Sequence, residues 1–171
     1  MIKKITKNIF QISFMEFGSC VYLIKSKNNI LIDSGSHNNQ KELLDELVKL
    51  NLTPFDINIV ILTHGHFDHV GNIEIFEKAE IYGSNDDFNC KKVKDIKKLK
   101  LPGLNIIETP GHTKGSISLF LIKEKILFSG DTLFHDGIGR TDFPNSSPED
   151  MKNSLNELKE LKYKILCPGH I

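Results

Sequence analysis

Three histidines and one aspartate lie within six residues, in the run His64-Gly65-His66-Phe67-Asp68-His69. The run directly follows an apolar segment, residues 57–62, whose length and composition predict a strand buried on both faces. A loop at the end of that strand therefore presents three imidazoles and a carboxylate together. Imidazole and carboxylate are the ligands that zinc, iron and manganese accept in proteins. The run predicts a metal site rather than a polar surface loop.

A strand followed by a turn and a histidine occurs twice more. Pro110-Gly111-His112 follows a predicted strand at 106–108, and Pro168-Gly169-His170 follows another at 164–167. In both places a Pro-Gly turn redirects the chain where the strand ends. Ligands that come from several strand ends predict a single site along one edge of a layered fold of strands and helices.

Strands and helices alternate along the chain in two blocks, roughly 1–100 and 101–171. Runs of β-branched and aromatic residues predict strands, and apolar spacing with a helical period predicts helices. The expected strands are 9–14, 21–24, 30–32, 57–62, 79–82, 106–108, 116–122, 125–129 and 164–167. The expected helices are 40–51, 72–78, a lysine-rich helix at 85–99, and one that begins at Ser147-Pro148. No linker separates the blocks, so we expect one domain over residues 1–171.

Composition excludes several classes of protein. Lys+Arg and Asp+Glu both number 22, and a net charge of zero disfavours a nucleic-acid partner. No apolar run approaches ~18 residues, so we expect no membrane-spanning segment. The first ten residues lack the apolar core of a secretory signal. Three dispersed cysteines without a C-x-x-C pair are typical of reduced thiols, which indicates a cytoplasmic protein.

These motifs resemble those of the metallo-β-lactamase fold superfamily. The H-x-H-x-D-H motif of that family is matched at 64–69. Later segments are matched by T-P-G-H-T at 109–113, S-G-D-T-L-F at 129–134 and P-G-H at 168–170. With L-I-D-S-G at 31–35, five segments follow the family's order over nearly the whole chain. The resemblance implies an α+β fold, an αββα sandwich of two packed mixed β-sheets flanked by helices, with metals at one edge.

The resemblance also implies two divalent metal ions, each with an open position, as in catalytic sites. The implied ligands of the first ion are His64, His66 and His112, those of the second are Asp68, His69 and His170, and Asp131 bridges the two. Asp68 and Asp131 are the implied catalytic residues. Zinc is the expected metal, and iron or manganese are alternatives because the ligands mix nitrogen and oxygen.

Other residues near these motifs are predicted to support the site. Asp33 is expected to accept a hydrogen bond from a ligand imidazole, and an ordinary residue at a strand end is the alternative. Arg140 is the only arginine among 22 basic residues, which indicates a position where the planar guanidinium is needed, with Asp142 as its bidentate partner. An ordinary surface arginine is the alternative. Lys114 and His135 are candidates for substrate binding, and for His135 the capping of a turn is the alternative. The basic run Lys91–Lys100 is expected to be solvated surface, and an anion-steering rim is the alternative.

The segment G-I-G-R-T-D-F-P at 137–144 helps to choose among members of the superfamily. It resembles the signature of small glyoxalase II-like hydrolases, which cleave hydroxyacyl-glutathione thioesters. Persulfide dioxygenases share G-R-T-D-F and use a single iron. The β-lactamases of this fold carry Cys or Ser where Asp131 stands, which disfavours antibiotic hydrolysis. Flavodiiron proteins have Glu at the position of His66.

The resemblance therefore implies a binuclear metallohydrolase in which a metal-bridged hydroxide attacks a thioester. A thiol leaving group with a pKa near 8.5 needs little protonation. A mononuclear iron persulfide dioxygenase is the alternative enzyme, and a metal-binding module without catalysis is the alternative outside enzymes. We expect the chain to lack the C-terminal helical domain of longer glyoxalase II enzymes, which leaves the thiol carrier open. The expected partner is a small molecule, and the oligomeric state stays open.

Overall fold

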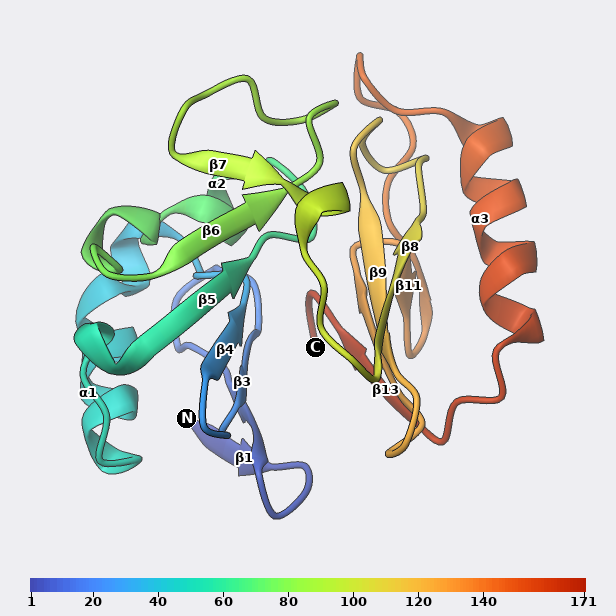
Figure 1. Ribbon diagram of the computed structural model, residues 1–171. Coiled ribbons are helices and arrows are strands. Elements are labelled where there is room, and N and C mark those ends of the chain that lie inside the picture. Colours follow the sequence, from blue (N-terminus) through green and yellow to red (C-terminus); the bar gives the residue numbers. More distant parts are fainter. The chain divides into compact units, whose positions relative to one another are not determined.

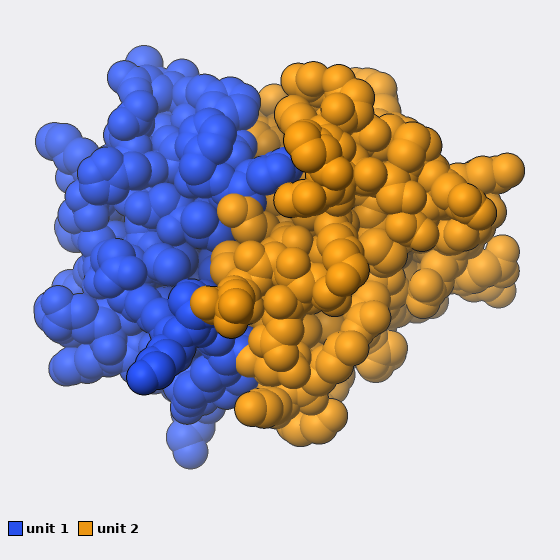
Figure 2. Space-filling view, turned by 90° about the horizontal axis from the view of Figure 1, so that it is seen from above, with its two compact units in different colours: residues 1–62, 66–82, 90–94 blue, residues 63–65, 83–89, 95–171 orange.

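The computed structural model describes residues 1–171 (Figure 1). The chain divides into two compact units, which Figure 2 shows in different colours. Unit 1 comprises Met1–Leu62, His66–Tyr82 and Cys90–Lys94, and unit 2 comprises Thr63–Gly65, Gly83–Asn89 and Asp95–Ile171. The boundary at Gly65 falls inside the histidine run, so each unit receives part of the run. One domain over residues 1–171 stays a prediction.

Unit 1 contains most of a seven-stranded sheet whose strand order follows the chain, from β1 to β7. The strands are β1 (Ile2–Lys4), β2 (Ile9–Ile12), β3 (Val21–Ile24), β4 (Asn29–Ile32), β5 (Ile57–Ile61), β6 (Glu80–Gly83) and β7 (Val93–Asp95). Strands β1 to β4 pair antiparallel, and β5 is parallel to both β4 and β6. The neighbouring residues Val60 and Ile61 on β5 are fully buried, which confirms the predicted strand buried on both faces.

Helices complete unit 1. Helix α1 (Gln40–Lys49) buries Leu43 and Leu47, which lie four residues apart and so share one face. The other elements are the single turn α2 (Phe67–Val70) and the short 3₁₀ helices η1 (His37–Asn39), η2 (Pro54–Asp56) and η3 (Ile73–Ile75). Helix α2 carries the second half of the histidine run.

Unit 2 contains a four-stranded sheet in the order β13-β10-β9-β8. Its strands are β8 (Leu104–Glu108), β9 (Ile117–Leu121), β10 (Ile126–Gly130) and β13 (Ile165–Pro168). Helix α3 (Pro148–Glu160) flanks this sheet (Figure 1). It begins where predicted, because the Ser147 side chain accepts a hydrogen bond from the backbone N–H of Asp150. A short hairpin of β11 (Leu133–Phe134) and β12 (Gly137–Ile138) and the 3₁₀ helix η4 (Ile96–Lys98) complete the unit.

Each unit thus combines a mixed sheet with helices, and the predicted α+β class is confirmed. None of the helices reaches the length and hydropathy that a membrane crossing needs.

The lysine-rich helix predicted at 85–99 is wrong. The segment folds as turns, then β7, then η4. Val93 is buried between Lys92 and Lys94, an alternation typical of a strand, and the two lysines pair with the surface acids Glu74 and Glu80. Asp95 then accepts a hydrogen bond from the backbone N–H of Lys97 and begins the single turn of η4.

The short helix predicted at 72–78 forms only in part, as the 3₁₀ helix η3. The buried side chain of Asn72 donates hydrogen bonds to the backbone carbonyls of Ser34 and Ser36, both at 2.7 Å. These contacts hold the chain just after α2 against the segment that contains Ser34 and Ser36.

Candidate metal centre

The histidine and aspartate side chains that could hold a metal ion are His64, His66, Asp68, His69, His112, Asp131 and His170. All seven are the ligands that the sequence predicts. Four belong to unit 2, namely His64, His112, Asp131 and His170, and the other three belong to unit 1.

In unit 2 the direction of the strands brings three of these side chains to one edge of the sheet. Strands β10 and β13 are parallel, and β9 is antiparallel to both β10 and β8. Strands β8, β10 and β13 therefore share one direction, and their carboxyl ends lead to His112, Asp131 and His170. The backbone N–H of Gly169 donates to the carbonyl of Gly130 at 2.8 Å, which ties the last two strand ends together.

Asp131 lies between two imidazoles. Its Oδ2 atom is 3.5 Å from Nε2 of His112 and 3.4 Å from Nε2 of His170. Both distances exceed those of ordinary hydrogen bonds between nitrogen and oxygen. Two ligands that each stand ~2.0–2.2 Å from one tetrahedral ion are separated by about 3.4 Å. The donor types and their spacing around Asp131 therefore fit metal ligation.

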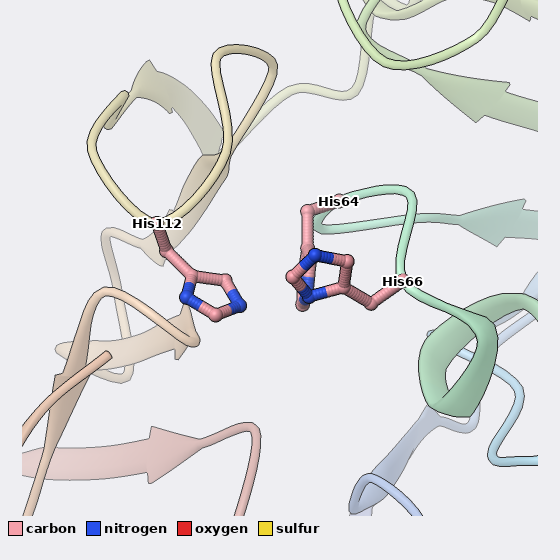
Figure 3. A group of neighbouring side chains, drawn as sticks. All are labelled: His64, His66 and His112. Atoms are coloured by element: carbon pink, nitrogen blue, oxygen red, sulfur yellow. The ribbon is translucent and has the colours of Figure 1, made fainter. Parts of the chain in front are cut away.

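The ring of His112 is held in one orientation. Its Nδ1 atom lies 2.8 Å from the backbone carbonyl oxygen of Arg140. Because a carbonyl oxygen can only accept, Nδ1 donates this hydrogen bond, which turns the Nε2 edge of the ring toward Asp131. Figure 3 shows the rings of His112 and His64, which meet edge to face with 4.9 Å between centroids. His66, labelled in the same figure, belongs to unit 1 and follows His64 by two residues.

In unit 1 the corresponding partner is Asp33. Its Oδ2 atom lies 2.8 Å from Nδ1 of His69, and both side chains are buried. Asp33 has a φ of 59°, a left-handed conformation that aspartate and asparagine tolerate better than most residues. The Nε2 atom of His69 lies 3.9 Å from Oδ2 of Asp68, on the same turn of α2. Asp33 thus orients a predicted ligand, as a carboxylate behind a metal-bound histidine does.

The guanidinium of Arg140 forms two hydrogen bonds with Asp142, at 2.9 and 2.7 Å. They lower the pKa of Asp142 and raise that of Arg140 relative to their ordinary values. The guanidinium also lies 4.5 Å from the ring centroid of Phe143, whose ring meets His112 edge-on at 5.8 Å. A Cβ atom on Gly139 would lie 1.8 Å from the carbonyl oxygen of Asp131, so glycine permits this loop to approach Asp131. The loop thus carries both the carbonyl and the ring that contact His112.

Lys114 and His135 have surface environments. The Lys114 ammonium lies 2.7 Å from Oδ1 of Asp86, and this hydrogen bond raises the pKa of Lys114 and lowers that of Asp86. His135 is exposed in the turn between β11 and β12. Substrate binding by either residue stays a prediction.

The basic run Lys91–Lys100 has acidic partners outside it. Besides the pairs of Lys92 and Lys94 described above, Lys97 lies 2.8 Å from Glu108. Acidic partners on the surface neutralise part of the positive charge, so these contacts favour solvated surface over an anion-steering rim.

One residue of the site region escaped the sequence analysis. Asp87, in the segment Gly83–Asn89 of unit 2, accepts hydrogen bonds from Gly65, Thr113 and Gly115. Its partners lie 22 to 28 positions away in the chain. No local pattern in the sequence predicts such contacts.

Comparison with known proteins places the chain among metallohydrolases. The family model described as "Metallo-beta-lactamase superfamily" matches residues 15–84 and 80–170. The chain is 34% identical to "Probable metallo-hydrolase MJ0888" of Methanocaldococcus jannaschii, over 95% of this chain and 92% of that protein. It is 33% identical to "Hydroxyacylglutathione hydrolase GloC" of Haemophilus influenzae, over 75% and 72%. The crystal structure of TTHA1623 in a di-iron-bound form superimposes with a TM-score of 0.80 and 26% identity, over 95% and 92%.

Proposed function

We propose, from the premise that this chain belongs to the metallo-β-lactamase superfamily, that it is a binuclear hydrolase of hydroxyacyl-glutathione-like thioesters. Membership confirms the predicted fold and establishes the chain as a metallohydrolase homologue. The number of ions, the ligand assignment and the substrate are the proposal. The observation that carries it is the position of Asp131 between His112 and His170 at the spacing of ligands that share an ion.

The proposed ligand assignment uses all seven side chains. The first ion is held by His64, His66 and His112, the second by Asp68, His69 and His170, and both by Asp131. Zinc is the first expectation, and the di-iron form of TTHA1623 supports iron as the alternative. When bound, two such ions supply an activated water and polarise the carbonyl under attack.

The protein's own groups prepare that site in two ways. The Arg140 carbonyl and the Asp33 carboxylate accept the Nδ1 protons of His112 and His69, so that both imidazoles present Nε2 lone pairs. The carboxylates of Asp68 and Asp131 offset the positive charge of the ions, which neutral imidazoles cannot do. The leaving group needs little help from the protein, since a thiol with a pKa near 8.5 departs readily as a thiolate.

The substrate class rests on Asp131 and on similarity to a thioester hydrolase. Asp131 stands where the β-lactamases of this fold carry Cys or Ser, and the chain is 33% identical to a hydroxyacylglutathione hydrolase. Unit 2 also has a cavity of about 400 Å³ lined by Gly111, Lys114, residues 144–147 and three aspartates. Its volume suits a small molecule, and Gly111 precedes the proposed ligand His112.

An anaerobic assay tests this function. The metal-loaded protein, given a hydroxyacyl-glutathione thioester without oxygen, is expected to release glutathione, measured by its reaction with a disulfide reagent. The chromogenic β-lactam nitrocefin serves as the specificity control and should remain uncleaved. A mononuclear dioxygenase would instead consume oxygen with glutathione persulfide. Oxygen uptake with no thioester cleavage would therefore overturn the proposal.

A further inference from the structure

Asp87 binds two loops of unit 2 through one carboxylate. Its Oδ2 atom accepts hydrogen bonds from the backbone N–H of Gly65 at 2.9 Å and from the hydroxyl of Thr113 at 2.7 Å. Its Oδ1 atom accepts one from the backbone N–H of Gly115 at 2.8 Å. Both carboxylate oxygens are used, and hydrogen bonds to an ionised acceptor are stronger than neutral ones.

The donors adjoin three of the proposed ligands of the first ion. Gly65 stands between His64 and His66, and Thr113 directly follows His112. A shift of either backbone segment would therefore move an imidazole. The rings of His64 and His112 already meet edge to face at 4.9 Å (Figure 3), so a small change in one loop alters the geometry of the pair.

Glycine at two of the donor positions makes this close approach possible. A Cβ atom on Gly115 would lie 2.6 Å from both Cγ and Oδ1 of Asp87, and one on Gly65 would lie 3.2 Å from Cβ of Asp87. Both contacts are closer than side chains normally allow. Glycine at positions 65 and 115 therefore leaves the space that the Asp87 carboxylate occupies between the two loops.

Asp86, the preceding residue, makes different contacts. Its exposed carboxylate pairs with the Lys114 ammonium at 2.7 Å and raises the pKa of that lysine. Asp87 thus accepts hydrogen bonds from the backbone of both loops, whereas Asp86 pairs only with a surface lysine. This difference provides a matched control.

We propose that Asp87 is a positioning residue for the first metal ion, which sets the separation of His64 and His112 by holding their loops on one carboxylate. The inference rests on the proposed metal assignment of these histidines and is independent of the proposed substrate. Asparagine at position 87 would offer only one acceptor oxygen, and its NH₂ group would face a donor. The loops should then separate, and the ligand geometry should relax.

The test uses the full chain and follows the metal rather than turnover. Asp87→Asn is expected to weaken zinc binding at the tighter of the two proposed metal sites by about 10- to 100-fold, which is the effect typical of losing a group that orients ligands. Competition with a chromophoric chelator measures this affinity. The visible absorption of the Co²⁺-substituted protein should also change in position and intensity. Asp86→Asn should leave zinc affinity and the Co²⁺ spectrum as in the unchanged protein.

A second variant covers the case in which Asp87→Asn fails to fold. Thr113→Val keeps the carboxylate and the side-chain volume and removes one donor, so it should weaken zinc binding in the same direction by a smaller factor. Zinc affinities and Co²⁺ spectra identical to those of the unchanged protein in both variants would overturn the inference. A chain that binds zinc but does not cleave the thioester would overturn the proposed function and leave this inference intact.

Discussion

Asp131→Asn is expected to give a folded protein that retains about one metal ion and hydrolyses thioester at least about a hundredfold more slowly. The asparagine keeps the size of the side chain and removes its negative charge. Since Asp131 Oδ2 lies within 3.5 Å of both His112 and His170, the loss affects the ligands of both proposed ions. The ions would repel each other with less compensation, and the second ion should dissociate first.

Metal content by plasma emission, a circular dichroism spectrum and the hydrolysis rate together measure this outcome. Asp136→Asn is a matched control, because Asp136 is an exposed aspartate in the turn between β11 and β12 and has no part in the proposed site. It should keep two ions and the full rate. An Asp131→Asn protein with two ions and an unchanged rate would show that Asp131 does not bridge them.

Asp33→Asn is expected to weaken binding of the second ion by about 10- to 100-fold. The buried carboxylate of Asp33 accepts the Nδ1 proton of His69 at 2.8 Å, which fixes the ring and makes Nε2 a better electron donor. Asparagine can adopt the left-handed backbone at this position, so the substitution isolates the charge from the local fold.

Zinc titration that resolves two binding steps measures the effect of Asp33→Asn. The first step should keep its affinity, since Asp33 contacts His69, which is a proposed ligand of the second ion. If the second step also keeps its affinity, then the Asp33–His69 contact does not strengthen metal binding by His69. A thermal melt of the metal-free protein checks that the variant folds.

The sequence predicts features of this fold that depend on local pattern. Strand β5 could be predicted because its continuous apolar run suits a strand buried on both faces. The bidentate contact of Arg140 with Asp142 could be proposed because the partners stand two residues apart. The order of the ligand motifs agrees with the superfamily match over residues 15–84 and 80–170.

Features that depend on contacts between distant segments could not be predicted. The lysines of residues 91–100 suggest a helix by composition, but Val93 is buried and Lys92 and Lys94 pair with acids 18 and 14 residues away. Tertiary contacts of this kind override local propensity. Asp87 went unnoticed for the same reason, because a single aspartate in a polar loop carries no spacing that points to Gly65 or Gly115.

Metal stoichiometry tests the central claim most directly. Protein reconstituted with excess zinc or iron, freed of loosely bound metal and analysed by plasma emission, should contain two ions per chain. The hydrolysis rate of the thioester should rise as the second ion binds. A content that stays at one ion per chain with either metal, whatever the excess, would contradict the binuclear centre and favour the mononuclear alternative.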